Sequence, residues 1–356
     1  MSKKIAVIIV CYNGREYLPD LLNSLKNQTL KPTEIIFVDN NSKDDSIDYV
    51  RKNFSEVILI ENKKNLGFAQ ANNQGIKEAF TRQNFSSENL SGLDFIFLLN
   101  QDTICDNNCL EELVKSAENE NAKTFAFQPL VLCWPEKDKI QTSGDKFHFL
   151  GFGYSGGYKL SIANGQSQSR DITYASGAAM FINTQALKEV GLLDEDLFMY
   201  HEDLDLCLRA RFLGYNIFLA PQSLVYHKYK AGVSPHRWYW SERNRGLTLL
   251  KFYKLPTLIL IFLPWLFMEL GVLGYSLMTG WFSLKIKTYF SALRLVPKTL
   301  IKRAKVQRTR KISDRQFSKY LEAKFNFAGF EHPLLKYLVN PIFGLYWKIF
   351  KKIIFW

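Results

Sequence analysis

Three acidic residues, Glu202, Asp203 and Asp205, lie close together in the segment FMYHEDLDLCLRAR. An amphipathic pattern follows them, so a helix is expected to begin at Asp203, and a short strand of small residues precedes them at 176–179. Two carboxylates at the start of a helix, soon after a buried strand, are well placed to take a proton from a substrate hydroxyl. The same acids would also stabilise a helix start by capping and by charge, and their spacing does not separate the two interpretations.

The elements that would position these acids alternate regularly in the first half of the chain. Short apolar runs predict strands at 5–11, 34–39, 57–60, 95–99 and 124–130, and amphipathic stretches predict helices at 16–27, 44–52, 69–82 and 107–119. This alternation is typical of an α/β fold with a mostly parallel sheet. The Gly- and Ser-rich residues 134–170 are expected to form a loop or a short antiparallel excursion.

Polar residues stand at the carboxyl ends of three expected strands. Asn13 follows the first strand, Asp39 closes the second and Asp102 follows the fourth. Ligands of such sheets bind beyond the carboxyl ends of the strands. The sequence therefore predicts a binding site at this edge of the sheet.

The net charge of +12 is concentrated at the C-terminal end of the chain. Residues 285–356 contain 17 lysines and arginines and three acidic residues, whereas residues 1–284 contain 29 basic and 31 acidic residues. Five cysteines without paired CxxC spacing fit a reducing compartment and do not indicate a zinc site. The N-terminal apolar run is short and lacks a cleavage signal, so we interpret it as a buried strand.

The region after residue 235 changes to long apolar helices. Residues 255–282 carry one charge, Glu269, and are long enough to span a bilayer. Pro256, Pro264 and the central carboxylate argue against spanning, since a carboxylate at the bilayer centre costs about 2.5–3.5 kcal/mol. An interfacial helical hairpin is therefore expected. The last 24 residues mix lysines with aromatic and aliphatic residues, as in-plane membrane helices do.

Two kinds of partner would suit this basic C-terminal region. The run 298–311 is rich in Lys and Arg, and such clusters bind nucleic acid through phosphates, so a basic nucleic-acid-binding protein is the alternative class. The neighbouring apolar helices and the lack of a nucleic-acid motif favour an anionic membrane surface instead. We expect three regions: a catalytic domain at 1–235, a membrane-associating helical segment at 236–300 and a basic, aromatic helical tail at 301–356.

Seven segments of the chain, in their order, resemble the GT-A glycosyltransferases of family 2, especially the bacterial branch of rhamnosyl- and galactofuranosyltransferases. The segments are VIIVCYN, IIFVDNNSKDDS, NLGFAQANNQGI, FLLNQDT, SGAAMFI, FMYHEDLDLCLRAR and VYHKYKAGVS. The resemblance covers roughly residues 4–250. It implies a GT-A fold, which is Rossmann-like with a mostly parallel sheet, followed here by a C-terminal amphipathic, membrane-associated helical extension.

The resemblance implies an inverting transferase that moves a sugar from a nucleotide-diphosphate donor to a saccharide hydroxyl. Asp203 matches the catalytic base, and Glu202 would be its neighbour that orients the base or the acceptor. Asp39 matches the residue that contacts the nucleotide base, and an acceptor-only carboxylate suits the imide N–H of uracil or thymine. Gly67 and Asn73 match a segment that lines the nucleotide pocket, although a glycine between a loop and a helix has an equally good structural explanation.

The resemblance also implies a divalent cation at the donor diphosphate. The Asp-x-Asp motif of the family is Asn100-Gln101-Asp102 in this chain, so only Asp102 keeps its carboxylate. His227 matches the later metal-binding histidine of the family. Asp102 and His227 are therefore expected to hold Mg²⁺ or Mn²⁺.

The branch favours deoxythymidine-diphosphate-rhamnose (dTDP-rhamnose) as the donor, with a uridine-diphosphate sugar (galactofuranose or another hexose) as the alternative. A lipid-linked saccharide acceptor would explain the basic, apolar C-terminal region, in the synthesis of a cell-surface polysaccharide or O-antigen. The implied location is the cytoplasmic face of the bacterial inner membrane, as a peripheral or monotopic protein. The sequence is compatible with an oligomer and indicates no nucleic-acid partner.

Overall fold

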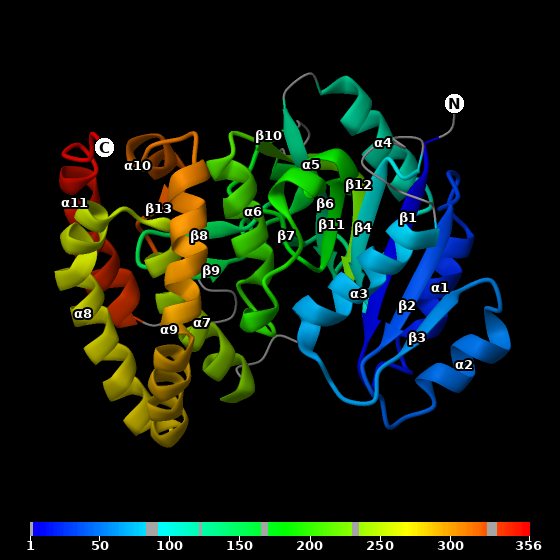
Figure 1. The fold of residues 1–356 in the computed structure, drawn as a ribbon, viewed down its shortest axis with the longest axis horizontal. Helices are drawn as coiled ribbons and strands as arrows, with labels where there is room; N and C mark the ends of the chain where they lie inside the picture. Colours follow the sequence, from blue (N-terminus) through cyan, green and yellow to red (C-terminus); the bar gives the residue numbers. More distant parts are fainter. Residues whose placement is uncertain (1–2, 83–91, 121–122, 165–169, 230–234, 326–332) are drawn as a thin grey trace.

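The first half of the chain folds as its alternating pattern predicts (Figure 1). The computed structural model describes residues 3–82, 92–120, 123–164, 170–229, 235–325 and 333–356. The first elements are β1 (Ile5–Cys11), α1 (Leu18–Lys26), β2 (Glu34–Asp39), α2 (Ser46–Asn53), β3 (Ile58–Glu61), α3 (Gly67–Arg82), β4 (Phe95–Asn100), β5 (Thr103–Cys105), α4 (Cys109–Asn119) and β6 (Thr124–Cys133). Every expected strand and helix of this half is confirmed, with ends that differ by a few residues.

The middle of the chain adds short antiparallel strands and two helices. Its elements are β7 (Ile140–Thr142), β8 (Lys146–His148), β9 (Gly153–Tyr154), β10 (Arg170–Asp171), β11 (Ala179–Asn183), α5 (Thr184–Val190), α6 (Glu202–Phe212) and β12 (Asn216–His227). β7 to β10 confirm the antiparallel excursion expected at 134–170, of which residues 165–169 lie outside the described part. Helix α6 begins at Glu202, one residue before the expected start.

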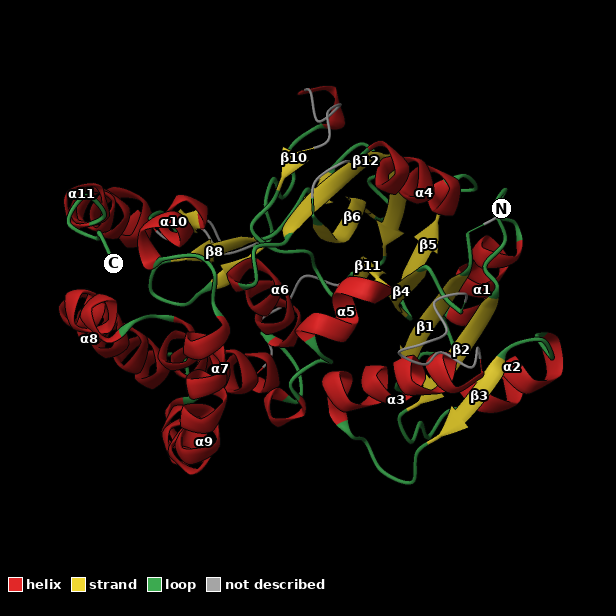
Figure 2. Ribbon diagram, turned by 45° about the horizontal axis from the view of Figure 1, so that its top comes forward, coloured by secondary structure: helices red, strands yellow, loops and turns green. Residues whose placement is uncertain are grey.

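The strands form one large sheet in the order β10-β12-β6-β11-β4-β1-β2-β3, with β5 on β12 and β7 on β6. β1 to β4 pair in parallel, and so do β6 and β12, whereas β11 runs antiparallel to both of its neighbours. Alternate side chains of β1 point to opposite faces: Ile5, Val7 and Ile9 pack with α1 and α4, and Ala6 and Ile8 pack with α3. Helices therefore cover both faces of the sheet (Figure 2).

The C-terminal region is packed against the α/β domain and is not a separate appendage. Its elements are α7 (Pro235–Phe252), α8 (Leu255–Met278), α9 (Phe282–Thr309), α10 (Asp314–Phe317), β13 (Leu321–Glu322) and α11 (Asn340–Phe350). β13 joins β8 and β9 in a small second sheet, and the Trp347 ring stacks on Phe149 with centroids 4.7 Å apart. The boundary expected at 235 coincides with the start of α7. The boundary expected at 300 is wrong, because it falls inside α9, which is one continuous helix.

Residues 255–282 do not form the expected hairpin by themselves. α8 is a single helix that continues through Pro264, and the chain reverses only after it, into α9. Of the described helices, α8 alone is long and apolar enough to cross a membrane by length and composition. Glu269 points inward from α8, where its carboxylate contacts Arg245, Lys285 and the Tyr289 hydroxyl. The charge that argued against spanning is therefore neutralised inside the protein.

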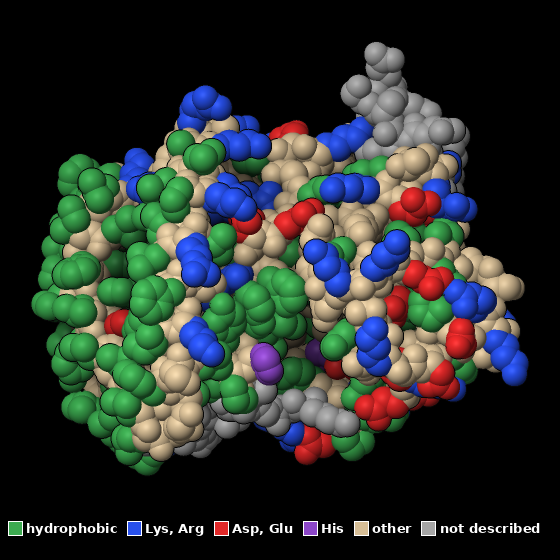
Figure 3. Space-filling view, turned by 60° about the horizontal axis from the view of Figure 1, so that its bottom comes forward, with side chains coloured by type: hydrophobic (Ala, Val, Ile, Leu, Met, Phe, Trp, Pro, Cys, Tyr) green, Lys and Arg blue, Asp and Glu red, His purple; other side chains and the backbone are tan. Residues whose placement is uncertain are grey.

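Large apolar side chains are exposed along α8, α9 and the segment that contains α11, and Figure 3 shows them gathered at the end of the molecule where α8 and α11 lie. We call this surface the apolar face. It includes Ile259, Leu263, Phe267, Leu270, Phe290, Ile301, Ile342, Leu345 and Phe355. Soluble proteins rarely expose so many neighbouring large apolar groups without a partner surface.

Candidate functional site

A cavity of about 520 Å³ brings the predicted chemical groups together. Its walls come from the ends of β4 and β12, from the β7–β9 excursion, from the start of α6 and from α7. Asp102, Glu202, Asp203 and His227 all line it, although they are far apart in the sequence. The carboxyl edge of the sheet therefore holds the site.

Asp203 is fixed by backbone donors at the start of α6. The Gly177 N–H donates to Asp203 Oδ2 at 2.9 Å, and the Leu204 N–H donates to Oδ1 at 2.7 Å. A Cβ atom on Gly177 would lie 3.5 Å from the Asp203 Cβ and 3.1 Å from the Phe68 ring, so the glycine allows this close approach. The small residues 176–178, where a strand was expected, form a turn just before β11, and this turn orients the carboxylate toward the cavity.

Glu202 and Asp203 share a buried environment but differ in their hydrogen bonds. Burial raises the pKa of both carboxyls, and the charge of Asp203 raises the pKa of Glu202 further, well above its usual range. The backbone N–H groups of Gly177, Leu204 and Asp203 oppose this effect at Asp203, whereas Glu202 Oε2 has no hydrogen-bond partner among the described residues. The pKa of Glu202 is therefore raised further than that of Asp203, so a proton shared by the pair favours Glu202.

Asp102 and His227 meet at the ends of β4 and β12. His227 Nε2 lies 3.0 Å from Asp102 Oδ1, and His227 Nδ1 lies 3.0 Å from Gln141 Oε1. An amide oxygen only accepts, so Nδ1 carries a hydrogen and donates it to Gln141. A proton or a cation must then lie between Nε2 and the carboxylate, because two acceptors in contact repel. Burial acts to raise the pKa of Asp102, but His227 lowers it below its usual value.

The oxygen and nitrogen atoms of Asp102 and His227 suit a divalent cation. Among the described residues, no third His, Cys, Asp or Glu completes a cluster with them. Mg²⁺ is often held by one or two protein groups together with substrate phosphates and water. Histidine ligands usually donate their second N–H to a fixed acceptor, and Gln141 has this position here.

Asp39 lies at the end of β2 with one oxygen occupied and one available. Its Oδ2 accepts the Ser42 N–H at 2.9 Å, while Oδ1 is buried and has no partner in the described part of the chain. A buried carboxylate oxygen without a donor is costly unless a ligand supplies one. Asp39 is not among the residues that line the cavity.

Comparison with known proteins decides the family. Residues 6–191, more than half of the chain, match the model of Glycosyl transferase family 2. The chain belongs to glycosyl transferase family 2. It is 24% identical over 221 residues to the low-salt glycan biosynthesis hexosyltransferase Agl10 of Haloferax volcanii, which covers 61% of this chain and 64% of that protein. It is 26% identical over 264 residues to the dTDP-rhamnosyl transferase RfbF of Shigella flexneri, and this alignment covers 70% of this chain and 81% of RfbF.

The family-2 chain spans less than two thirds of the length of some curated relatives. It is 24% identical over 289 residues to the poly-beta-1,6-N-acetyl-D-glucosamine synthase of Staphylococcus aureus, and it spans 64% of that protein, as it does of Agl10. Among solved structures, S. aureus TarS 1-349 in complex with UDP aligns over 98% of this chain and 91% of its own, at 19% identity and a TM-score of 0.51. GalNAc-T7 with UDP, GalNAc and Mn²⁺ aligns over 71% and 48%, at 16% identity and a TM-score of 0.55. These likenesses confirm the GT-A fold.

Gly67 and Asn73, which the family resemblance assigned to the nucleotide pocket, hold the loop that leads to α6. Gly67 has φ +81°, and a Cβ atom there would lie 2.5 Å from the Phe198 ring. The Asn73 amide donates to Leu193 O at 3.0 Å and to Glu195 Oε1 at 2.9 Å, and its oxygen accepts the Leu193 N–H. Neither residue lines the cavity. Their contact with a nucleotide stays a prediction beside this packing role.

The loop before Glu202 and Asp203 in this family-2 chain is strained and is held by α7. Phe198, Tyr200 and His201 all have positive φ, between 62° and 70°, which non-glycine residues rarely adopt. Such backbone persists only where its surroundings fix it. The buried Asn244 amide of α7 donates to the carbonyls of this loop: Leu197 O at 2.9 Å, Met199 O at 3.1 Å and Tyr200 O at 2.6 Å.

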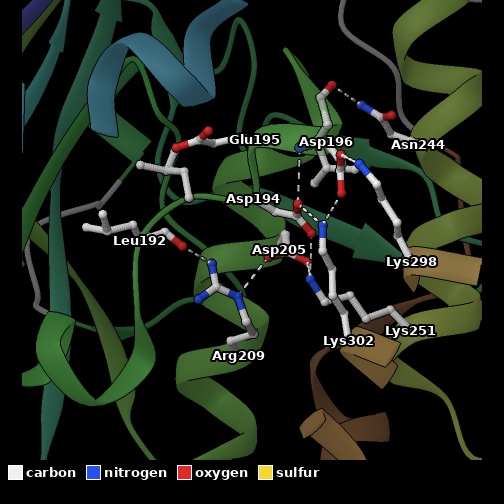
Figure 4. A network of polar contacts seen from close by, with 12 residues as sticks. Leu192, Asp194, Glu195, Asp196, Asp205, Arg209, Asn244, Lys251, Lys298 and Lys302 are labelled. Carbon is white, nitrogen blue, oxygen red and sulfur yellow. Dashed lines mark hydrogen bonds and ion pairs between the residues drawn. The ribbon is translucent and has the colours of Figure 1, made fainter. Parts of the chain in front are cut away.

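A cluster of ion pairs joins the same loop to α6, α7 and α9 (Figure 4). Lys251 contacts Asp194 at 2.9 Å and Asp205 at 2.5 Å, and Lys302 contacts Asp196 at 2.7 Å and also Asp194. Arg209 donates to Asp205 at 2.8 Å and to Leu192 O at 2.7 Å. We call this group the ionic cluster. It holds Asp205, the third acid of the sequence motif, in ion pairs outside the cavity lining.

Sequence reasoning missed three residues of the site: Gln141, Asp145 and Asn244. Asp145 lines the cavity, and burial raises its pKa to about 7, with Asp203 adding to the effect. Gln141 and Asp145 lie in the irregular excursion, where no periodic pattern marks a functional position. Asn244 lies within a helix whose polar residues read as a solvated face.

Proposed function

We propose that this chain is an inverting glycosyltransferase and that Asp203 is its catalytic base. The observation that carries the proposal is the Asp203 carboxylate, which is half-buried, held by two N–H donors and placed in the wall of the cavity. In the single displacement, the acceptor hydroxyl gives its proton to Asp203 while its oxygen attacks the anomeric carbon. The bond from that carbon to the diphosphate oxygen breaks, and the nucleoside diphosphate leaves with the bonding electrons. Glu202 donates a hydrogen bond from its protonated carboxyl to the acceptor or the base.

Asp102 and His227 are proposed to hold a divalent cation, Mg²⁺ or Mn²⁺. The fit rests on their donor atoms, which meet at 3.0 Å and require a proton or a cation between them. The cation would neutralise the charge that develops on the leaving diphosphate. Gln141 would keep His227 in the tautomer that directs Nε2 to this point.

The proposed donor is dTDP-rhamnose, with a UDP-sugar as the alternative. The relative RfbF is named a dTDP-rhamnosyl transferase, and the solved structures of TarS and GalNAc-T7 contain UDP. Both nucleotides carry the imide N–H that the unpaired Asp39 Oδ1 could accept. The proposed product is a saccharide of a cell-surface polysaccharide or O-antigen, built on a lipid-linked acceptor.

A donor screen tests the activity. Nucleoside diphosphate release would be measured with dTDP-rhamnose and a panel of UDP-sugars, with Mn²⁺ or with chelator. We expect one donor to turn over and chelator to abolish the release. Asp102→Ala and His227→Ala should each weaken metal-dependent donor binding. Release that ignores chelator would contradict the metal assignment, and no release from any donor would contradict the function.

The apolar face is proposed to bind an anionic membrane at the cytoplasmic surface of a bacterial inner membrane. Its exposed side chains would enter the lipid interface, and the exposed basic residues of 285–356 that form no ion pair within the protein would meet anionic head groups, each contributing about 1 kcal/mol where well placed. Several basic residues of the run 298–311 are engaged within the protein: Lys298 and Lys302 contact Asp196, and Arg310 contacts Asp314. This engagement weakens the alternative of a nucleic-acid-binding protein.

Vesicle sedimentation tests the membrane proposal. The protein should sediment with vesicles that contain phosphatidylglycerol, be released poorly by high salt and be released fully by detergent, because salt screens only the charges. Leu263→Glu, on the apolar face, should weaken sedimentation, whereas Gln185→Glu, on the exposed side of α5, adds the same charge elsewhere and should not. A wild-type protein that stays in solution, or equal sedimentation of the two variants, would contradict the proposal.

A further inference from the structure

One wall of the cavity has no role in the proposed displacement. It comes from the β7–β9 excursion, the segment just before β11 and α7, and not from the ends of β4 and β12 that hold Asp102 and His227. We call it the aromatic wall. It consists of Asp145, Phe152, Tyr154, Tyr158, Tyr174 and Trp238. Rings with a few polar groups among them are typical of binding surfaces for small ligands.

The aromatic wall lies next to the proposed base. The Asp145 N–H donates to Tyr174 O at 3.0 Å, which joins the two residues into a short bridge. A Cβ atom on Gly153 would lie 2.6 Å from the Tyr174 hydroxyl and 4.0 Å from Leu204, the residue after Asp203. A ligand on this wall would therefore present its groups to Asp203.

Two rings of the wall are fixed by contacts outside the cavity. Trp238 stacks on the buried Trp281 with centroids 5.3 Å apart and planes 12° from parallel. The Tyr154 hydroxyl donates to Lys324 O at 2.7 Å. Rings held in this way lose little freedom when they bind a ligand, which favours affinity.

The charges on this wall are negative. Asp145, Glu202 and Asp203 all line the cavity, and among the described lining residues the Lys and Arg side chains are Arg237 and Arg245. Arg245 is occupied by Glu242 at 3.0 Å and by Glu269. Arg237 contacts the hydroxyl of Tyr229, two residues after His227, and so belongs to the diphosphate side. An anionic ligand on the aromatic wall would lie next to the carboxylates of Asp145 and Asp203.

We propose that the aromatic wall binds a neutral pyranose ring of the acceptor, with Trp238 and Tyr154 against its C–H faces and Asp145 accepting a hydroxyl. This inference rests on the proposed transfer function, because it identifies the ligand of the wall as the acceptor. It excludes acceptors whose attacked unit is a uronic acid or a polyol phosphate, since like charges in one site cost several kcal/mol.

Binding of simple glycosides tests the inference without knowledge of the natural acceptor. Saturation-transfer NMR would be measured with methyl α-L-rhamnoside, methyl β-D-galactoside and methyl β-D-glucoside, and with methyl β-D-glucuronide and glycerol phosphate as anionic probes. We expect at least one neutral glycoside to bind, and the glucuronide to bind at least about tenfold more weakly than the matched glucoside. Asp145→Asn should reduce the difference in affinity between the glucoside and the glucuronide. Trp238→Ala should weaken the binding of the neutral glycosides by up to about tenfold.

The matched control is Asp138→Asn, which removes one carboxylate at the exposed turn after β6 and should leave this difference in affinity unchanged. The inference is overturned if no neutral glycoside binds, if the glucuronide binds as well as the glucoside, or if Asp145→Asn and Trp238→Ala both behave as wild type. Tyr154→Leu repeats the ring test should Trp238→Ala not fold. Glycoside binding without turnover of any sugar nucleotide would leave this site standing and remove the proposed function.

Discussion

The cavity and the ionic cluster each gather buried acids around the start of α6, and they differ in what faces those acids. In the cavity, Asp145, Glu202 and Asp203 form no ion pair among the described residues, and burial raises the pKa of each. In the ionic cluster, burial acts to raise the pKa of Asp194, but Lys251 and Lys302 lower it to about 2.

Two acids of one sequence motif, Asp203 and Asp205, therefore have different surroundings. Asp203 and Asp205 are two residues apart, yet Asp203 receives only backbone N–H groups whereas Asp205 receives Lys251 and Arg209. A carboxylate that is paired with cations is a weak base and holds structure. A buried carboxylate with its charge uncompensated can take a proton, which is why perturbed groups gather at functional sites.

Removing the cation from the ionic cluster should have the largest effect on stability. Lys251→Met would leave Asp194 and Asp205 buried without their shared partner, and breaking a buried pair in this way costs about 3–5 kcal/mol. Urea unfolding would measure the loss. Lys298→Met is the control, because the Lys298 side chain is 64% exposed and its pair with Asp196 should contribute only about 0.2–1 kcal/mol. Equal losses in the two variants would show that the cluster does not act as a buried network.

The two regions should respond to pH in opposite directions. The pKa of Asp145 is about 7 in the fold against 3.8 unfolded, so the fold binds the extra proton and stability falls as pH rises from about 4 to about 7. The pKa of Asp194 is about 2, so its contribution is present above 3.8 and is lost as pH falls toward 2. The urea concentration at the midpoint of unfolding would be measured as a function of pH. Its change between pH of about 4 and about 7 should be smaller in Asp145→Asn than in wild type, and its change below pH 3.8 should be smaller in Asp194→Asn. Curves parallel to wild type would contradict both assignments.

Loss of the Gln141 side chain, which accepts the hydrogen bond from His227 Nδ1, should have a smaller effect, on metal affinity alone. Gln141→Leu removes the partner of Nδ1, and loss of such a partner typically weakens metal binding by about 10–100-fold. A Mn²⁺ titration of nucleoside diphosphate release would measure it. Gln141→Glu keeps an acceptor and should retain most of the affinity. An unchanged titration in Gln141→Leu would mean that His227 needs no orientation or holds no metal.

Regular patterns made the sheet of this protein predictable. The strands before Asp39 and Asp102 are short apolar runs between amphipathic helices, and the parallel topology brings their ends to one edge. The spacing of the acids singled out Glu202 and Asp203, the family resemblance supplied His227, and the structure brings these together with Asp102.

The remaining features depend on contacts that no local pattern encodes. Asp145 lies in an irregular segment, and its role follows only from the cavity it faces. Glu269 looked like a charge in a membrane-length helix, but Arg245 and Lys285, from two other helices, neutralise it. Asn73 is a further example, because its partner Leu193 lies 120 residues later in the chain.

The turnover number of Asp203→Asn at saturating donor and acceptor tests the central claim most directly. The change removes the base and keeps the size of the side chain, so turnover should fall by about 10²–10⁴ while nucleoside diphosphate binding stays near wild type. Glu202→Gln, which keeps a neutral hydrogen-bonding side chain at the protonated position, should fall much less. Near-normal turnover in Asp203→Asn, with the large loss in Glu202→Gln instead, would show that the proton goes to Glu202 and that the assignment of charge within the pair is wrong.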